Sequence, residues 1–308
     1  MQALKTLHQL GKELGAEVYL AGGTVRDLVR EHTPNDFDLI VRGASPEAFE
    51  QFLRKRGRLD LVGKSFGVYL FQQDGASIEI AFPRKEVSIG AGHRDFQVVT
   101  DPNISLEEDS SRRDFTCNAL FLSLEHYLGN PNGIDRRQIL DYHGGLEHMH
   151  RRLIVAVGRP EERLDEDPLR MLRAMVLLAR TGYRLEGGTF GAIKRKAPSI
   201  NTVAAERIGQ EVIKIMESEK PSRAFKAMER TGLLSIVLPE VSACVGCGQN
   251  PKHHSYPVFE HIIYAADAAC SITDNLAVRF SALCHDLGKA PTRAVRPNGD
   301  GPDDVSFH

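Results

Sequence analysis

Two short motifs near the start of the chain constrain its fold more than any other feature. Residues 17–21 read as a buried strand, and the diglycine Gly22-Gly23 that follows is predicted to open a helix whose free N–H groups could hold phosphate. Asp36 and Asp38 are predicted to lie in the next strand. Because strand side chains alternate between faces, both carboxylates project to one side, as Mg²⁺ requires.

Neither motif is specific when it stands alone. A diglycine is usually a turn, and an Asp-x-Asp is usually a solvated strand edge or loop. No Gly-Lys-Ser/Thr follows the glycines, which excludes a P-loop, and the dinucleotide pattern G-x-G-x-x-G is absent there. The order and spacing of the two motifs favour a site where a metal-bound nucleotide reacts.

The length and composition indicate an ordinary soluble protein. A chain of 308 residues predicts two or three compact units. It has neither a run of about 18 apolar residues nor a signal-peptide core, so we expect a cytoplasmic protein without a membrane segment. Five cysteines without paired spacing argue against a disulfide framework. Arginines cluster between residues 112 and 184, so a polyanion would be bound by one face of the protein.

The pattern of elements predicts an α+β fold. Residues 68–71 and 77–81 read as a hairpin, and Glu79 would be a third carboxylate of the site if its strand neighbours that of Asp38. On local sequence alone, an exposed strand glutamate is the preferred interpretation. After Gly144-Gly145 the pattern is mainly helical, with one apolar stripe at Leu169, Leu172 and Val176 and a second at Ile208, Val212 and Ile215. We therefore expect a mixed sheet with helices in residues 1–125, a helical neck and body in 126–240, and a further helical unit in 241–308.

Five motifs in a fixed order carry a family resemblance. Gly-Gly-x-Val-Arg-Asp and Asp-x-Asp are followed by Arg112-Arg113-Asp114-Phe115-Thr116, then by Glu166-Asp167-Pro168-Leu169-Arg170, and then by Glu206-Arg207. Over about residues 17–220 the chain resembles the class II tRNA nucleotidyltransferases, or CCA-adding enzymes, and the related bacterial poly(A) polymerases. The resemblance implies template-independent addition of CCA to tRNA from CTP and ATP.

The resemblance also assigns roles to the residues that match its motifs. Asp36 and Asp38 would hold two Mg²⁺ ions for an in-line displacement, with Glu79 as the third carboxylate. Arginine side chains suit phosphate oxygens, and the Arg113 segment would meet the sugar and phosphates. The nucleotide-binding set implied in this way is Gly22, Gly23, Arg26, Asp27, Arg113, Asp114, Asn118, Asp167, Arg170 and Arg173.

Asp167 and Arg170 are the residues that could choose the base. Cytosine and adenine each offer an amine donor beside a ring-nitrogen acceptor, which a carboxylate and a guanidinium would match. Three residues apart on a helix, the two side chains would share one face. Asp167 before Pro168 is also a good helix cap, and both roles are compatible. The family commonly has a second arginine where this chain has Val176, so one phosphate contact is expected to be missing.

Two further segments resemble parts of related enzymes. Residues 84–109, which include Gly90-Ala91-Gly92, resemble the flexible loop that switches the family from adding C to adding A. His261, together with His285-Asp286, resembles the ligand pattern of HD phosphohydrolases, which hold a transition metal. The later ligands of an HD domain are not found before His308, so we expect only a partial HD domain. Cys244 and Cys247 with His253 and His254 are spaced too closely for a usual zinc finger and are expected to form a loop.

Three functions remain open on the sequence. The first is CCA addition, the second is poly(A) or A-only addition within the same family, and the third is an RNA-binding homologue without catalysis. The intact pair Asp36 and Asp38 disfavours the third.

Overall fold

The computed structural model describes residues 1–34, 36–63, 67–88, 96–130, 133–250, 255–296 and 304–307. Their contacts gather in two compact units. The head unit consists of Met1–Arg151 and Val155–Arg159, and the helical unit consists of Arg152–Ile154 and Pro160–His308. The predicted α+β class is confirmed, whereas the predicted division into three parts stays a prediction.

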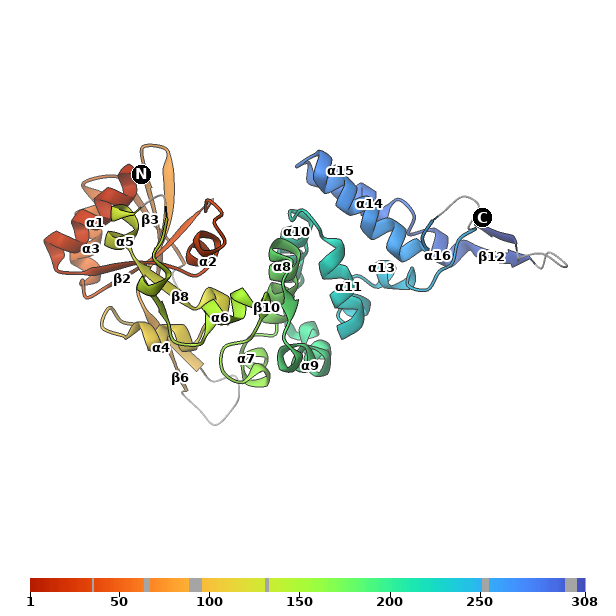
Figure 1. Cartoon of the computed structure of the whole chain (residues 1–308), viewed down its shortest axis with the longest axis horizontal. Coiled ribbons are helices and arrows are strands. Elements are labelled where there is room, and N and C mark those ends of the chain that lie inside the picture. Colours follow the sequence, from red (N-terminus) through yellow and green to blue (C-terminus); the bar gives the residue numbers. More distant parts are fainter. Residues whose placement is uncertain are drawn as a thin grey trace. The chain divides into compact units, whose positions relative to one another are not determined.

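A mixed seven-stranded sheet forms the centre of the head unit, drawn in red to yellow-green in Figure 1. The strand order is β3-β4-β5-β2-β1-β8-β9. Strands β2 and β5 run parallel, and their neighbours in the sheet pair antiparallel. The bounds are β1 Glu17–Ala21, β2 Phe37–Arg42, β3 Arg58–Gly63, β4 Val68–Gln73, β5 Ala76–Ala81, β8 Leu120–Ser123 and β9 Ile139–Asp141.

Amphipathic helices and tight turns hold this sheet. Helix α1 buries Leu4, Leu7 and Leu10 at helical spacing, and Ser45 caps the start of α3 because its hydroxyl accepts a hydrogen bond from the backbone N–H of Ala48. The predicted hairpin is present as β4 and β5, joined across Asp74-Gly75. The helices of the head unit are α1 Gln2–Leu14, α2 Gly23–Val29, α3 Pro46–Arg54, α4 Leu106–Ser111, α5 Leu124–Gly129 and α6 Gly145–His150.

A separate hairpin occupies the segment that resembles the family's flexible loop. Strands β6 Arg84–Ser88 and β7 Phe96–Thr100 pair antiparallel, with Arg84 opposite Thr100. The glycines at 90 and 92 lie outside the described residues. Short 3-10 turns, η1 Thr116–Asn118 and η2 Arg136–Gln138, complete the head unit.

In the described part of the helical unit, the helices are accompanied by two short strand pairs, β10 with β11 and β12 with β13. Leu169, Leu172 and Val176 are buried, as their spacing predicts. Within the described ranges, no helix is both long enough and apolar enough to cross a membrane. The elements are β10 Leu153–Ile154, α7 Pro160–Glu166, α8 Arg170–Thr181, β11 Arg184–Leu185, α9 Gly187–Lys196, η3 Ala197–Thr202, α10 Ala205–Met216, α11 Ser222–Thr231, α12 Leu234–Val237, α13 Pro239–Ala243, α14 Val258–Ile272, α15 Leu276–Cys284, α16 Lys289–Thr292, β12 Arg293–Arg296 and β13 Asp304–Phe307.

Candidate functional site

Three carboxylates meet at the centre of the head-unit sheet. Strands β2 and β5 are neighbours, and Asp38 is the direct register partner of Glu79. The strand pairing that the role of Glu79 required is therefore present. Asp36 was expected inside the strand, but it lies one residue before β2 and is exposed, because the strand hydrogen bonding begins at Phe37.

The charge at this point is negative and only partly compensated. Burial raises the pKa of Asp38 to about 6, and the nearby carboxylates of Glu79 and Asp36 act in the same direction, whereas Arg113 and Arg26 act against them. A bound cation would favour the ionised form of this carboxylate and so lower its pKa. The donor set consists of hard oxygen atoms, which fits Mg²⁺.

Thr24, the variable position of the first motif, connects the helix to the carboxylates. Its hydroxyl donates to the backbone carbonyl of Asp36 (3.2 Å) and accepts from the backbone N–H of Asp38 (2.9 Å). The side chain is buried, with 2% of its surface exposed. Sequence reasoning passed over Thr24, although a hydroxyl residue next to a diglycine was the available signal. The Thr24 hydroxyl thus fixes the backbone at both Asp36 and Asp38.

Gly22 allows several groups to approach one another closely. Its φ of 62° lies in the left-handed region, and its N–H donates to the carbonyl of Leu120 (3.2 Å). A Cβ atom there would lie 3.1 Å from Nη1 of Arg113 and 3.7 Å from Oδ2 of Asp38. The helix α2 begins at Gly23, so the N–H of Gly22 is not among the free donors that the sequence predicted. Glycine is needed at position 22 for both its conformation and its space.

A polar network holds Arg26 beside this turn. Nε and Nη2 of Arg26 bond the carboxylate of Asp27 (2.9 and 2.8 Å), and Nη1 donates to Oδ1 of Asn118 (2.8 Å). Asn118 in turn donates from Nδ2 to Asp114 (3.2 Å). Arg26 is 8% exposed, so its guanidinium is held in one orientation. The four residues predicted from two distant motifs thus form one connected set.

Arg113 lies beside the Gly22 turn and close enough to Asp38 to affect its pKa. Its Nη1 donates to the carbonyl of Asn118 (2.9 Å), and its guanidinium carbon lies 4.8 Å from the centre of the Phe121 ring. The head unit therefore brings together Glu79 of β5 and the residues predicted from its three motifs: Gly22, Gly23, Arg26, Asp27, Asp36, Asp38, Arg113, Asp114 and Asn118.

The predicted base-selecting residues lie in the helical unit. Asp167 was expected on the same helix as Arg170, but α7 ends at Glu166 and α8 begins at Arg170, so Asp167 lies in the turn between them. This follows from Pro168, which disfavours helical backbone in the residue before it. Asp167 accepts from the N–H of Leu169 (3.2 Å), which caps this turn.

Each member of this pair has a partner of opposite charge. Oδ2 of Asp167 lies 3.2 Å from Nη2 of Arg207, which belongs to the last of the five motifs. Nη1 of Arg170 bonds Oε2 of Glu166 (2.5 Å) and the carbonyl of Arg163 (2.9 Å). Arg170 is 7% exposed. Both side chains are thereby held in place by neighbours in the helical unit.

Helix α8 also explains the departure at position 176. Arg173 is exposed, whereas Val176 is 7% exposed and belongs to the core. The valine that stands in place of the family's arginine thus contributes to packing in this chain.

A second polar cluster lies farther along the helical unit. Nε2 of His261 on α14 lies 3.0 Å from Nε2 of His285, and each lies 3.4 Å from Oδ2 of Asp286. Nδ1 of His285 bonds the carbonyl of Ala282 (2.8 Å). The three potential ligand atoms lie within 4.8 Å of one another, so the residues of the HD pattern are brought together.

The cysteine motif gives no comparable cluster among the described residues. Cys244 and Cys247 are buried in the turn after α13. His253 and His254 lie outside the described residues.

Comparisons with known proteins bear on this arrangement. Residues 18–155 match the family described as Poly A polymerase head domain, and residues 182–244 match the one described as Probable RNA and SrmB-binding site of polymerase A. The "Multifunctional CCA protein" of Nitrosospira multiformis is 33% identical over 279 residues, and that of Chromobacterium violaceum is 34% identical over 282. Each alignment covers 90% of this chain, but only 62% and 64% of the respective relative.

Solved structures share the fold. The Bacillus stearothermophilus CCA-adding enzyme in complex with CTP aligns with a TM-score of 0.61 and 25% identity, over 93% of this chain and 73% of that one. A tRNA nucleotidyltransferase complexed with a primer tRNA and an incoming ATP analog aligns with a TM-score of 0.66 and 22% identity, over 91% of this chain and 75% of that one. Given these matches and the motifs gathered in each unit, the chain belongs to the family of class II tRNA nucleotidyltransferases and bacterial poly(A) polymerases.

Proposed function

We propose that this protein adds or repairs the 3′-terminal CCA of tRNA, using CTP and ATP and releasing pyrophosphate. The observation that carries the proposal is the register pairing of Asp38 with Glu79 beside Arg113 and the Gly22 turn. In such an arrangement the carboxylates can bind metal ions, and the guanidinium can bind the triphosphate that the metal carries. The relatives are named as CCA proteins and CCA-adding enzymes, which supports the choice of tRNA and of these nucleotides. We infer a cytoplasmic location, as expected from the sequence, since the substrate would be tRNA.

Asp36 and Asp38 would hold two Mg²⁺ ions, with Glu79 as a third carboxylate of the site. The raised pKa of Asp38 supports this assignment, because burial and the neighbouring carboxylates disfavour its charge without a cation. When bound, the ions would activate the RNA 3′-hydroxyl and stabilise the leaving pyrophosphate.

The remaining residues would bind and orient the substrates. Arg26 and Arg113 would meet phosphate oxygens, for which a guanidinium offers paired donors. Asp27 and Asn118 keep Arg26 oriented through bonds of 2.8–2.9 Å. Asp114 and Asn118 together offer an acceptor and a donor for a ribose hydroxyl.

Asp167 and Arg170 would select the base. The carboxylate accepts from the exocyclic amine of cytosine or adenine, and the guanidinium donates to the ring nitrogen. Uracil and guanine present the opposite pattern at these positions. The ion pairs of Asp167 with Arg207 and of Arg170 with Glu166 support a fixed orientation for each base-selecting side chain. Arg173 would add an exposed positive charge nearby on α8.

Nucleotide incorporation separates CCA addition from the alternatives within the family. The protein is incubated with tRNA that lacks its 3′ end and with one labelled nucleotide at a time, and then with both. Ordered addition of C, C and A followed by arrest supports the proposal. Unlimited A without prior C addition would identify a poly(A) polymerase, and a single A on a CC end would identify an A-adding enzyme.

An RNA-binding homologue without catalysis is the alternative of another class. Substituting Asp36→Ala should remove incorporation while leaving tRNA binding within about twofold, because a metal ligand contributes to chemistry and not to docking. Residual activity equal to that of the wild type would contradict the metal assignment.

The His261, His285 and Asp286 cluster supports a separate proposal for a transition-metal site. Because Nδ1 of His285 faces a carbonyl oxygen, its proton is placed there and Nε2 is left as a ligand atom. Combined with the remaining ligands of an HD domain, these residues would support metal-dependent phosphohydrolase activity, and substituting His285 or Asp286 should abolish it.

A further inference from the structure

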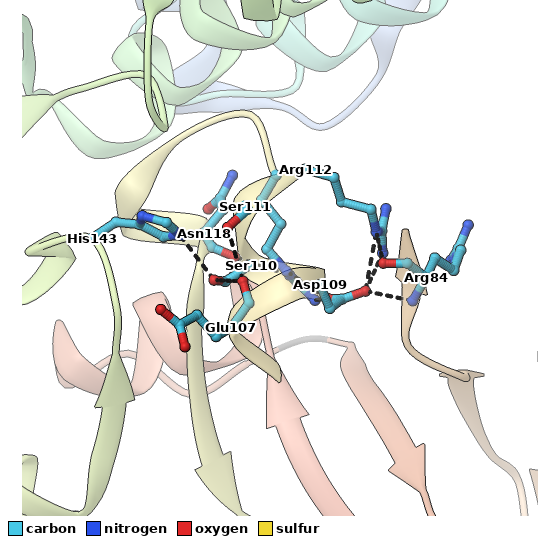
Figure 2. Close-up of polar contacts among 9 residues, drawn as sticks. Arg84, Glu107, Asp109, Ser110, Ser111, Arg112, Asn118 and His143 are labelled. Atoms are coloured by element: carbon cyan, nitrogen blue, oxygen red, sulfur yellow. Dashed lines mark hydrogen bonds and ion pairs between the residues drawn. The ribbon is translucent and has the colours of Figure 1, made fainter. Parts of the chain in front are cut away.

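Asp109 on α4 is a fully buried carboxylate at the edge of the nucleotide site. Its exposed fraction is 0%. Oδ1 accepts from the backbone N–H of Arg84 (3.1 Å) and from Nε and Nη2 of Arg112 (3.0 and 2.6 Å). Oδ2 accepts from Nε and Nη2 of Arg113 (3.2 and 3.0 Å). Figure 2 shows the carboxylate of Asp109 between Arg84 and Arg112.

The contacts with Arg113 fix one edge of its guanidinium. Asp109 takes Nε and Nη2, so Nη1 is the group that faces the Asn118 carbonyl and the Gly22 turn. The Phe121 ring supports the guanidinium plane. A planar guanidinium held on one edge and on one face has a single orientation, which is the condition for meeting a phosphate with its remaining N–H groups.

The electrostatics favour a charged Asp109. Burial alone would raise the pKa of Asp109, but Arg113 and Arg112 outweigh it and the net shift is downward. A buried anion between two cations is stable only with all partners present. Loss of the carboxylate would therefore disturb both arginines.

The neighbours of Asp109 are themselves anchored on two sides. Nε of Arg112 donates to the carbonyl of Arg84 (3.2 Å), so the start of β6 is bonded on both its N–H and its carbonyl. On the other side of α4, the Ser110 hydroxyl contacts Nε2 of His143 at 2.8 Å (Figure 2). Asp109 is thus fixed by elements on either side of the helix.

We propose that Asp109 is a positioning residue for nucleotide binding: its carboxylate orients Arg113 toward the Gly22 turn and Asp38. The inference rests on the proposed function, since it assumes that Arg113 meets the incoming nucleotide. In addition, the contact of Arg113 with the nucleotide depends on Asp109, which lies four positions earlier and touches no substrate. Because Arg113 would act on the triphosphate and sugar, the effect is the same for CTP and ATP.

The test compares nucleotide KM and kcat in variants of Asp109. Asp109→Asn replaces one acceptor oxygen by a donor, and Asp109→Glu keeps the charge but moves it by one methylene. Each should raise the KM for CTP and for ATP equally, by roughly tenfold, which corresponds to one lost hydrogen bond to a charged group. Glu107→Gln, an exposed position on the same helix, should leave both values unchanged.

A double variant shows whether Asp109 acts through Arg113. Asp109→Glu combined with Arg113→Lys should be no worse than Arg113→Lys alone, because the two residues share one interaction. Additive losses, a change confined to ATP, or an unchanged KM despite a lower Tm would each overturn the proposal.

A binding titration with CTP keeps the proposal separate from the proposed function. The ratio of Kd between each variant and the wild type reports on Asp109 even if the wild type fails to add CCA. Failure of the wild type to incorporate either nucleotide would contradict the proposed function, and an unchanged Kd ratio would contradict the role of Asp109.

Discussion

Asp38 and Glu79 are register partners on the parallel strands β2 and β5, so their side chains leave the sheet on the same face. The chain thus places two acidic side chains of neighbouring strands side by side near Asp36. Such an arrangement stabilises a bound cation at the expense of the cation-free fold.

The first prediction concerns the opposite effects of Asp38 on metal-dependent activity and on stability without metal. Asp38→Asn should lower nucleotide incorporation by at least about 100-fold, since a metal ligand supplies several kcal/mol to the transition state. In metal-free buffer the same variant should be more stable, by roughly 1–2 kcal/mol after allowance for solvent screening, because it removes a charge that burial disfavours. Incorporation assays and thermal unfolding in EDTA measure the two effects. Asp36→Asn is the control: it lies exposed, so it should lose activity with little change in stability.

The second prediction concerns pH. The pKa of Asp38 is raised from 3.8 to about 6, so the folded protein binds this proton more tightly than the unfolded chain does. Its contribution to stability is fully present below pH 3.8 and is lost as the pH rises to about 6. The Tm difference between Asp38→Asn and wild type, without metal, should therefore grow across this window and level off above it. A difference that stays constant from pH 4 to pH 7 would contradict the raised pKa.

The third prediction compares two glycines with positive φ. Gly15 (φ 64°, ψ 26°) has the left-handed helical conformation, where alanine should cost about 1–2 kcal/mol, whereas Gly22 (φ 62°, ψ −127°) has a conformation that is less accessible to alanine. Only at Gly22 would the new Cβ meet Arg113, at 3.1 Å from Nη1, whereas nothing lies within 4 Å at Gly15. We expect a larger Tm loss for Gly22→Ala than for Gly15→Ala, and, at a temperature where both variants are folded, a loss of incorporation for Gly22→Ala alone. Equal activities of the two folded variants would show that the approach of Arg113 is unimportant.

The fourth prediction tests the partner of Asp167. Arg207→Ala removes the ion pair at 3.2 Å and frees the carboxylate to rotate. Discrimination of CTP and ATP against UTP and GTP should fall, by about tenfold or less for a partly exposed pair. Single-nucleotide incorporation with all four triphosphates measures it. Arg180→Ala, which removes an exposed pair with Glu217 in the same unit, should leave discrimination unchanged.

The fifth prediction concerns the histidine cluster. Nζ of Lys289 lies 2.7 Å from Oδ2 of Asp286 and occupies the place of a cation. Lys289→Ala should therefore strengthen binding of Mn²⁺ or Co²⁺, and His261→Ala should weaken it by about tenfold or more. Calorimetric titration of the protein with each metal decides this. Weaker binding by Lys289→Ala would contradict the assignment.

Much of the head-unit site followed from local patterns. Alternation placed Asp38 on a strand face, and the hairpin of β4 and β5 followed from its turn residues. The position of Glu79 could be stated only conditionally, because its pairing with Asp38 joins strands that are distant in sequence. Register between distant strands depends on packing of the whole sheet, which no local pattern contains.

Two other features could not be predicted for different reasons. Asp167 lies outside α8 because Pro168 restricts the residue before it, and this effect outweighed the helical spacing to Arg170. Asp109 is three and four residues from Arg112 and Arg113, a spacing that indicates helix-surface ion pairs. Its burial, which turns these pairs into a fixed network, depends on β6 and on the packing of the head unit.

The sheet order has a consequence for the persistence of the site during thermal motion. Glu79, Asp38 and Leu120 lie on three of the five inner strands, β5, β2 and β8, and the Gly22 turn directly follows a fourth, β1. Inner strands are hydrogen-bonded on both sides, so they exchange their amide protons last, whereas the edges at β3 and β9 open first. The carboxylates should therefore keep their spacing through the local opening events that expose the edges, and be lost only when the whole head unit unfolds.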